Sequence, residues 1–266
     1  MATNPLFVLR GELSTQQRWI LSTLGIVLFL LIWIVLTYFK LVPSGILPSP
    51  WQVLKAFPEL HYQDALVRNT AFSVWLNLRG YLEAIAIALP LGFLIGLVPL
   101  FRGLLSKIID TGRYIPLTAV TGLFIAWFGL GSAMKVHFLA FGILVYLLPV
   151  VVQRIDEVED IYLKTVFTLG ANAWQTVRTV YLPAVLSRVS DDIRVLVAIS
   201  WTYIIIAEMV GSEGGIGSLI FRVGQRQGRI DKVFALLIII ILIGFLQDRI
   251  MLFLDKKLFP YKYLNR

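Results

Sequence analysis

Residues 20–39 form an uncharged and almost wholly apolar run, which constrains the fold more than any other feature of the sequence. As an α-helix this run would be about 30 Å long, which matches the hydrocarbon core of a bilayer. Further apolar runs cover 81–100, 106–128, 136–152, 193–210 and 233–254. Apolar residues make up 58% of the chain and charged residues 15%, whereas soluble domains have about 45–50% and about 25%. We therefore predict an all-α polytopic membrane protein with six transmembrane helices in a single domain, 1–266.

The first and third of these spans need separate arguments. A cleavable signal peptide is the alternative for the first, but its apolar region would be shorter and no small-residue cleavage site follows. The third span is broken by Pro116 and Gly122. It must borrow length from residues 104–114 or be shielded by protein, because a broken helix in lipid leaves backbone groups unpaired.

The distribution of positive charge predicts the orientation. Six spans place both termini on one side, and Lys and Arg are more numerous in the segments on that side. By the positive-inside rule both termini lie in the cytoplasm, together with the polar segment 153–190. The net charge of +8 indicates loops that face anionic lipid headgroups rather than nucleic acid.

The segment 153–190 is predicted to be structured rather than a simple linker. Acidic residues within 156–160 suit the beginning of a helix, where the helix dipole favours negative charge. Apolar residues recur at helical spacing on both sides of Gly170, so we expect a helix, a glycine corner and a second short helix, with a further turn at Pro183. The apolar face either folds back on its own bundle or enters a groove on another subunit.

Two segments on the opposite side of the membrane have their own organisation. Ser49 and Pro50 read as a helix cap and first helical residue, opening a short helix to about Leu60. This helix either shapes the outer rim or docks an external partner. Arg222, Arg226 and Arg229 recur on one helix face; they either funnel anions or form a rim that contacts an acidic binding protein.

Few charged residues lie at membrane depth. Arg79 and Glu83 are four residues apart and can pair on one helix face. The candidates for the translocation path are two sets, one in the third span and one at seven-residue spacing in the fifth: Thr118, Thr121, Gly122, Arg194, Trp201 and Glu208. The second set either faces the path or a partner subunit, or pairs with other helices of the chain. The first set either lines the path or permits close helix packing.

The chemistry of an enzyme is missing from the sequence. There is no G-x-x-x-x-G-K-[ST] motif to hold nucleotide phosphates. His61 and His137 stand alone without metal-ligand spacing, and cysteine is absent. No catalytic set of carboxylates or of serine, histidine and aspartate converges. We therefore expect no enzymatic activity, no metal and no cofactor.

Several motifs in order along the chain resemble permease subunits of binding-protein-dependent ABC importers. The cytoplasmic "EAA…G…LP" loop of that family is similar to Leu169-Gly170-Ala171, Trp174 and Tyr181-Leu182-Pro183. A second stretch, Arg113-Tyr114-Ile115-Pro116 followed by Ile125 to Gly131, resembles the family's "RPIP…ilWFGlG" segment. A third, with Arg194, Trp201, Ala207-Glu208 and then Gly215-Ile216-Gly217, resembles its "R……W…AE……GLG" segment. Over roughly residues 45–260 the match resembles the branch for nitrate, sulfonates, taurine and bicarbonate.

This resemblance implies a function and a set of partners. The chain would be a type I permease subunit in the inner membrane that moves a small, anionic solute. It would pair with a second permease subunit as a homodimer, with two cytoplasmic ATPase subunits and with an extracytoplasmic solute-binding protein. The expected ATPase-coupling residues are Lys164, Thr165, Leu169, Gly170, Ala171, Trp174, Leu182 and Pro183. The alternative is a secondary transporter or channel with a cytoplasmic regulatory loop.

The sequence departs from the family pattern at the start of the coupling loop and in the third span. Lys164 stands where the family has glutamate, and Thr165 and Val166 stand where it has two alanines. Tyr114 and Gly122 replace prolines. The lysine reverses a charge at the expected ATPase contact, so the partner either carries a compensating acid or is coupled differently.

Overall fold

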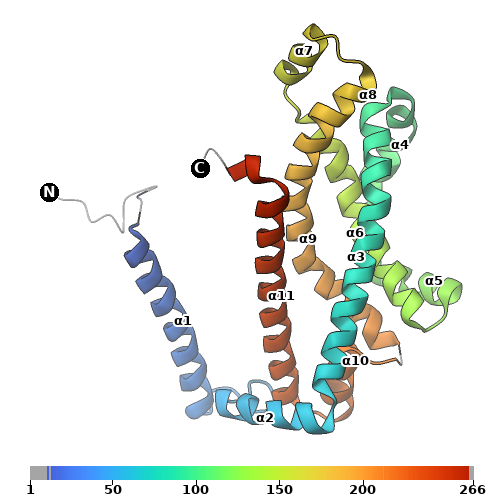
Figure 1. Ribbon diagram of the computed structural model, residues 1–266. Coiled ribbons are helices and arrows are strands. Elements are labelled where there is room, and N and C mark those ends of the chain that lie inside the picture. Colours follow the sequence, from blue (N-terminus) through green and yellow to red (C-terminus); the bar gives the residue numbers. More distant parts are fainter. Residues whose placement is uncertain (1–10, 12, 212, 264–266) are drawn as a thin grey trace.

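The computed structural model describes residues 11, 13–211 and 213–263, and every regular element in them is a helix. Five helices are long and apolar enough to cross a membrane (Figure 1): Thr15–Tyr38, Leu66–Leu97, Ser132–Asp156, Ala173–Val210 and Ile230–Leu258. The elements in chain order are α1 Thr15–Tyr38, α2 Pro50–Gln63, α3 Leu66–Leu97, α4 Pro99–Gly112, α5 Leu117–Phe128, α6 Ser132–Asp156, α7 Asp160–Thr168, α8 Ala173–Thr176, a π-helical turn Val177–Tyr181, α9 Leu182–Val210, α10 Ile216–Phe221, a π-helical turn Arg222–Arg226, α11 Ile230–Leu258 and a 3₁₀ turn Pro260–Tyr263.

The expected third span, 106–128, is not one helix. It is divided into α4 and the short apolar α5. Pro116 lies at the break and precedes the first turn of α5 in an extended conformation, with ψ 115°. Because the proline ring disfavours a helical conformation in the residue before it, a continuous helix through this point is prevented.

The centre of the bundle is α3 packed along α6, with α9 on the other side of α6 (Figure 1). Small residues on α3, Gly80, Ala84, Ala88 and Gly92, recur every four positions and are all buried. A Cβ atom at Gly80 would lie 2.7 Å from Leu139 Cδ2 of α6, and one at Gly92 would lie 2.5 Å from Val151 Cγ1. The two backbones therefore approach closely along a seam of small residues.

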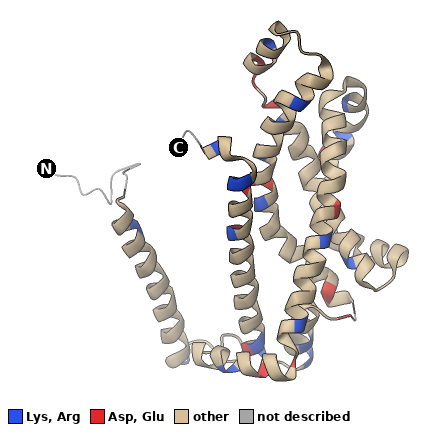
Figure 2. Ribbon diagram, viewed as in Figure 1, with Lys and Arg blue, Asp and Glu red and all other residues tan. Residues whose placement is uncertain are grey.

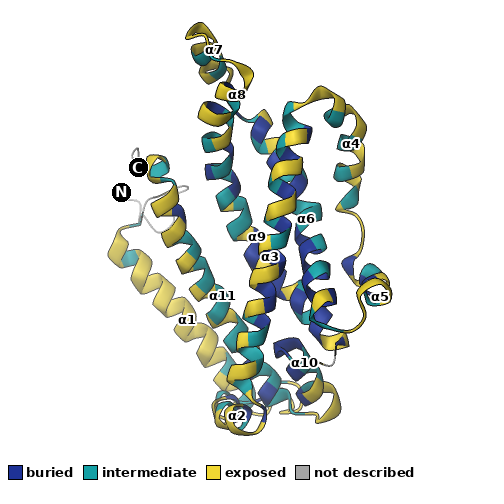
Figure 3. Ribbon diagram, turned by 45° about the vertical axis from the view of Figure 1, so that its right-hand side comes forward, coloured by how far each residue is buried: buried dark blue, intermediate teal, exposed yellow. Residues whose placement is uncertain are grey.

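Helix α1 stands apart from this core. None of its residues is buried, and its surface is exposed along its length (Figure 3). It is attached near one end, where Trp33 Nε1 donates to Pro48 O at 2.9 Å and the Trp33 ring lies 6.0 Å from that of Phe234 in α11. An apolar helix exposed all round is suited to lipid or to another membrane helix.

The short helix α2 lies across the end of the bundle at which α1 ends and α3 begins, opposite to α7 (Figure 1). Its cap is as predicted: the Gln52 backbone N–H donates to Ser49 Oγ, the Ser49 N–H donates to Gln52 Oε1, and Pro50 is the first helical residue. Most of α1 and the middle of α11 are uncharged, whereas α3 carries charged residues near its middle (Figure 2).

Candidate functional site: the α7 corner and the polar contacts of the bundle

Helix α7 projects beyond the ends of the long helices (Figure 1). It ends at a glycine corner in which Gly170 has φ 77°, a left-handed conformation that glycine adopts without steric cost. The Gly170 N–H donates to Phe167 O at 3.0 Å, and the Ala171 N–H donates to Val166 O at 3.0 Å. These two bonds form a Schellman motif, which ends the helix and sets the angle at which the chain leaves it.

The α7 corner has an inner and an outer face. Leu163 and Val166 are half-buried against the core of the chain. Phe167, Leu169 and Trp174 point away from it, with 58%, 80% and 71% of their surfaces exposed. The first alternative, folding back on the bundle, therefore holds for one face of α7 only. The outer face presents three large apolar side chains that the described part of the chain does not cover.

The chain returns from the corner into one long helix rather than a short one. Asn172 caps α8 by accepting from the Gln175 N–H at 2.9 Å. The expected turn at Pro183 is wrong, because α8, the π turn and α9 form a continuous helix from Ala173 to Val210. Proline lacks an N–H and its ring crowds the preceding turn. The wider π turn before Pro183, where the Leu182 N–H donates to Val177 O, absorbs this disturbance without ending the helix.

Ion pairs fix the base of the α7 corner. Arg154 of α6 makes two bonds of 2.8 Å to the carboxylate of Asp192 on α9, and a third of 2.6 Å to Glu157. Arg188 donates to Glu157 O at 2.8 Å. The hydrogen bond from Arg154 holds the pKa of Glu157 below its usual value. The two helices that lead into and out of the corner are thus joined side by side.

The C-terminal turn grips the same part of α9. Tyr261 donates to Pro183 O at 2.8 Å, and Lys262 Nζ donates to Ser187 O at 3.0 Å. Lys262 also pairs with Asp191 at 2.8 Å and with Asp255 of α11 at 3.0 Å. Burial lowers the pKa of Lys262, but the bonds to the two carboxylates outweigh it and raise the pKa overall. The sequence alone did not indicate this contact, because its partners are 78 and 75 residues apart in the chain.

Three residues expected along the translocation path each contact another helix of the same chain. Arg194 pairs with Asp248 of α11 at 2.6 Å, and Trp201 donates to Gln247 of α11 at 2.7 Å. Glu208 is fully buried and accepts from Ser73 of α3 at 2.6 Å. The seven-residue spacing does put them on one stripe, and each bonds to α11 or α3. Pairing between helices is thus present, and a role of these residues in the path stays a prediction.

The third-span candidates lie on α5. Thr121 is buried and donates to Leu117 O within its own helix. Thr118 and Gly122 are exposed, and a Cβ atom at Gly122 would meet nothing within 4 Å. Close packing within the chain is therefore not the reason for Gly122. α5 packs on α6 through Leu117 and Phe124 and leaves its other face uncovered.

Other expected pairs are rearranged. Glu83 bonds to His137 Nδ1 of α6 at 2.7 Å, instead of the expected contact with Arg79. His137 is thus a packing residue, and no group of metal-ligating side chains is found among the described residues.

Arg222 and Arg229 pair with acids of their own chain, Asp64 at 3.2 Å and Asp231 at 2.7 Å. They do not form the free anion funnel that their spacing allowed.

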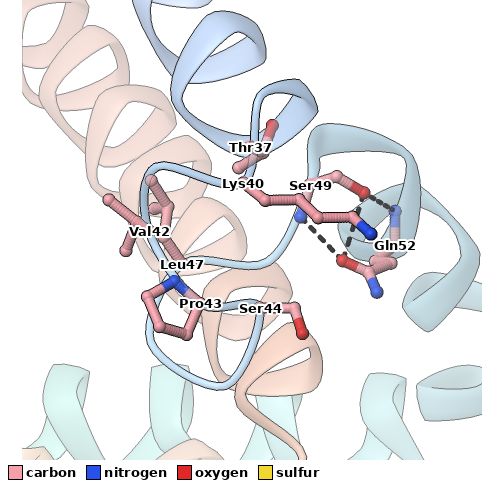
Figure 4. Close-up of a pocket in the computed structure, with 8 residues that line it drawn as sticks. All are labelled: Thr37, Lys40, Val42, Pro43, Ser44, Leu47, Ser49 and Gln52. Carbon is pink, nitrogen blue, oxygen red and sulfur yellow. Dashed lines mark hydrogen bonds between the residues drawn. The ribbon is translucent and has the colours of Figure 1, made fainter.

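A pocket of about 580 Å³ lies at the turn from α1 to α2, lined by Lys40, Pro43 and Ser44 among others (Figure 4). Ser49 and Gln52 on its wall are already joined in the cap of α2. This pocket is at the end of the molecule opposite to α7 and away from α5.

The family described as the inner membrane component of binding-protein-dependent transport systems matches residues 88–260. The chain belongs to this family. The taurine transport system permease protein TauC of Escherichia coli is 26% identical to this permease, over 95% of this chain and 92% of its own. The protein of Bacillus subtilis named aliphatic sulfonates transport permease protein SsuC is 29% identical, over 98% and 94%. An ABC transporter permease protein of Methanocaldococcus jannaschii is 31% identical over 76% of each chain.

Solved structures share the fold of the permease. A chain of a bacterial ABC transporter that imports the acidic polysaccharide alginate has a TM-score of 0.63 at 15% identity, covering 91% of the permease and 96% of that chain. A chain of the MetNI methionine ABC transporter, in an inward-facing conformation, has a TM-score of 0.60 at 22% identity, covering 70% and 94%. The permease therefore has the type I ABC importer fold, as its sequence motifs predicted, and is a multi-pass membrane transport protein.

The motifs that carried the resemblance have structural reasons in the permease. The Leu169-Gly170-Ala171 motif is the Schellman corner. The other expected coupling residues lie on α7, on α8 or in the first turn of α9, and Lys164 and Thr165 are exposed. The Gly215-Ile216-Gly217 motif packs its backbone on Glu208, which explains why two glycines stand there: a Cβ atom at Gly215 would lie 2.2 Å from Glu208 Cδ.

Proposed function

We propose that the permease is the membrane subunit of an ATP-driven importer, and that its α7 corner seats on a separate ATPase subunit. One observation carries this proposal: the corner between α7 and α8 exposes Phe167, Leu169 and Trp174 beyond the end of the bundle. Large apolar side chains in water are costly unless a partner covers them. A short helix with such a face fits the helix-in-groove mode of recognition.

The corner is attached so that it can transmit force. Arg154 and Asp192 join α6 and α9 at its base, and the C-terminal turn joins α9 to α11. When nucleotide draws two ATPase subunits together, the α7 corner moves with them. These contacts make α6, α9 and α11 follow as one body, which rocks the bundle from inward-facing to outward-facing.

The permease works as a pair, in this proposal a homodimer, with the solute path between the two copies. The uncovered face of α5, with Thr118 and Gly122, supports this arrangement, because it leaves small and polar groups without a packing partner in the chain. Arg194, Trp201 and Glu208 hold the helices behind that face in place.

Both termini and the α7 corner lie in the cytoplasm in this proposal. An extracytoplasmic binding protein delivers solute at the α2 end.

The solute is a small anion of the nitrate, taurine, sulfonate or bicarbonate kind. The relatives TauC and SsuC, named for taurine and aliphatic sulfonates, support this class. In this proposal the binding protein makes the final choice of solute.

The test is ATP-dependent uptake by membrane vesicles that contain the permease and the proteins that co-purify with it. Taurine, ethanesulfonate, nitrate and bicarbonate are offered as labelled probes. We expect uptake of at least one of them to require ATP and to stop when the P-loop lysine of the co-purifying ATPase is replaced. Uptake by the permease alone, or uptake driven by an ion gradient, would show a secondary transporter or channel instead.

A further inference from the structure

Five side chains hold the glycine-rich loop 213–217 after α9, which runs into the first two residues of α10. Each of the consecutive residues 213–217 bonds to a side chain from a different position on α3, α6 or α9. Ser132 donates to the Glu213 carboxylate at 2.6 Å and Lys135 donates to Gly214 O at 3.3 Å. The N–H groups of residues 215, 216 and 217 donate to Asn69, Ser73 and Glu208 at 2.9, 2.8 and 2.8 Å. We call these five side chains the loop clamp: Asn69, Ser73, Ser132, Lys135 and Glu208.

Two members of the loop clamp are charged and completely buried. Lys135 and Glu208 each have 0% of their surface exposed. A buried charge is tolerated only where it is paired and hydrogen-bonded. The Glu208 carboxylate satisfies this with one oxygen on Ser73 and the other on the Gly217 N–H. Lys135 Nζ donates to Gly214 O and lies 5.2 Å from the centre of the Phe72 ring.

The loop packs directly on the end of α9. A Cβ atom at Gly217 would lie 2.5 Å from Ile205 O of α9, so the loop backbone rests directly on that helix. Glu208 lies in the last turn of α9, and its carboxylate accepts a hydrogen bond from the Gly217 N–H. Any tilt or shift of this end of α9 therefore carries the loop with it.

The other end of the same helix is the α7 corner. The continuous helix Ala173–Val210 has 38 residues, which corresponds to a length of about 57 Å. It runs from the exposed corner at one end of the molecule to the loop clamp at the other (Figure 1). The loop also touches the start of α6 through Ser132 and Glu213, immediately after the α5–α6 turn.

We propose that Glu208 is a positioning residue that transmits movement of the α7 corner, through α9, to the loop 213–217, and that this loop opens and closes the outer end of the path. The inference rests on the proposed function, since it needs an ATPase that moves α7. Glu208 does not touch the solute in this account. It keeps the loop in step with α9, and Ser73 ties the same loop to α3, so a movement of α9 relative to α3 displaces the loop.

The experiment uses the permease co-purified with its ATPase subunits in proteoliposomes. The chain has no cysteine, so Ser218→Cys in α10, which is half-buried directly after the loop, is a single reporter in the permease. Its reaction with a membrane-impermeant maleimide is timed without nucleotide and after trapping with ATP and vanadate. We expect severalfold faster labelling in the trapped state, where the outer end is open.

Three variants in the reporter background then test Glu208. Glu208→Leu keeps the bulk but removes both hydrogen bonds, and should abolish the difference between the two states while ATP hydrolysis continues. Glu208→Gln can still accept from the Gly217 N–H and donate to Ser73, and should retain most of the difference. Met209→Leu changes the exposed neighbour of Glu208. It is the matched control and should retain the full difference between the two states.

The outcomes separate the inference from the proposed function. Equal labelling of the reporter in both states, or a full difference in Glu208→Leu, overturns the role of Glu208. If Glu208→Leu does not accumulate in the membrane, Glu208→Ala, which also removes both hydrogen bonds, is read in the same way. ATP-dependent uptake with a reporter that never responds leaves the importer assignment intact. Absence of any ATP-dependent uptake overturns that assignment instead.

Discussion

Gly170 matters at the residue scale because of its backbone, not because of crowding. A Cβ atom there would meet nothing within 4 Å, yet φ is 77°. A residue with a side chain in this conformation is strained by about 1–2 kcal/mol. The strain acts on the one turn that fixes where α7 presents Phe167, Leu169 and Trp174.

Gly170→Val should therefore reduce coupled transport while leaving the bundle folded. A strain near 1.4 kcal/mol corresponds to about a tenfold loss of correctly formed corner, so ATP-dependent uptake should fall by about that factor. Asparagine tolerates the left-handed conformation better than other residues with side chains, and Gly170→Asn is the matched control with a much smaller loss. Unchanged uptake in Gly170→Val would contradict the importance of the corner.

The buried ion pair between Asp64 and Lys232 fastens the α2 end of the bundle. The two side chains are 8% and 4% exposed, and Lys232 Nζ lies 2.8 Å from Asp64 Oδ2. Removal of one partner leaves an unpaired buried charge, which costs about 3–5 kcal/mol. The second contact of Lys232, to Glu59 at 3.6 Å, offsets part of this.

We expect Asp64→Ala to lower the thermal unfolding temperature of the detergent-solubilised permease markedly. The double variant Asp64→Ala with Lys232→Met should recover most of the loss, because it removes the orphaned charge as well. A single variant as stable as the wild type would show that the pair is solvated rather than buried.

At the scale of elements, the α3–α6 seam depends on glycine. A Cβ atom at Gly92 would lie 2.5 Å and 2.7 Å from Val151 atoms. Gly92→Ala should destabilise the permease by about 1–3 kcal/mol, the usual cost of overpacking. Gly103→Ala on α4 is the control, since a Cβ there meets nothing within 4 Å. It should be neutral or stabilise by up to about 1 kcal/mol, because alanine is the better helix former. Equal melting temperatures for the two variants would refute the close approach.

The elements predicted well from sequence are those fixed by local signals. The Ser49 and Pro50 cap of α2 and the corner at Gly170 depend on neighbours within a few residues. Apolar runs located the long helices, but α3 begins at Leu66 rather than near residue 81. Its first turns carry Ser73 and Asn77, buried polar residues that bond to α9 and that hydropathy counts against a span.

What the sequence could not provide is the partner of each polar side chain. The spacing of Arg194, Trp201 and Glu208 fixed their common face but not what lies opposite to it. That depends on α11 and α3, which are distant in the sequence. Pro183 was misread for a related reason, because the continuous helix accommodates it through a π turn that has no simple sequence signature.

At the scale of the whole molecule, the permease connects two ends of a membrane bundle through one long helix. Ion pairs join α6 and α9 at the base of the α7 corner, and α9 ends at the loop clamp. Helix α1 lies outside this framework and touches it near Trp33. Force that enters at α7 thus has a continuous, rigid route through the bundle, and α1 is not on it.

The most direct test of this account asks what α7 touches in the assembled transporter. A photo-activated cross-linking residue is placed at Leu169, 80% exposed on the α7 corner, and separately at Leu28, 59% exposed on α1, as a control. Irradiation of native membranes followed by mass spectrometry identifies each product. The account predicts that Leu169 captures a protein with a G-x-x-x-x-G-K-[ST] motif, that the yield changes with nucleotide, and that Leu28 does not capture it. A Leu169 product with lipid, with the permease itself, or with a protein that lacks this motif would contradict it.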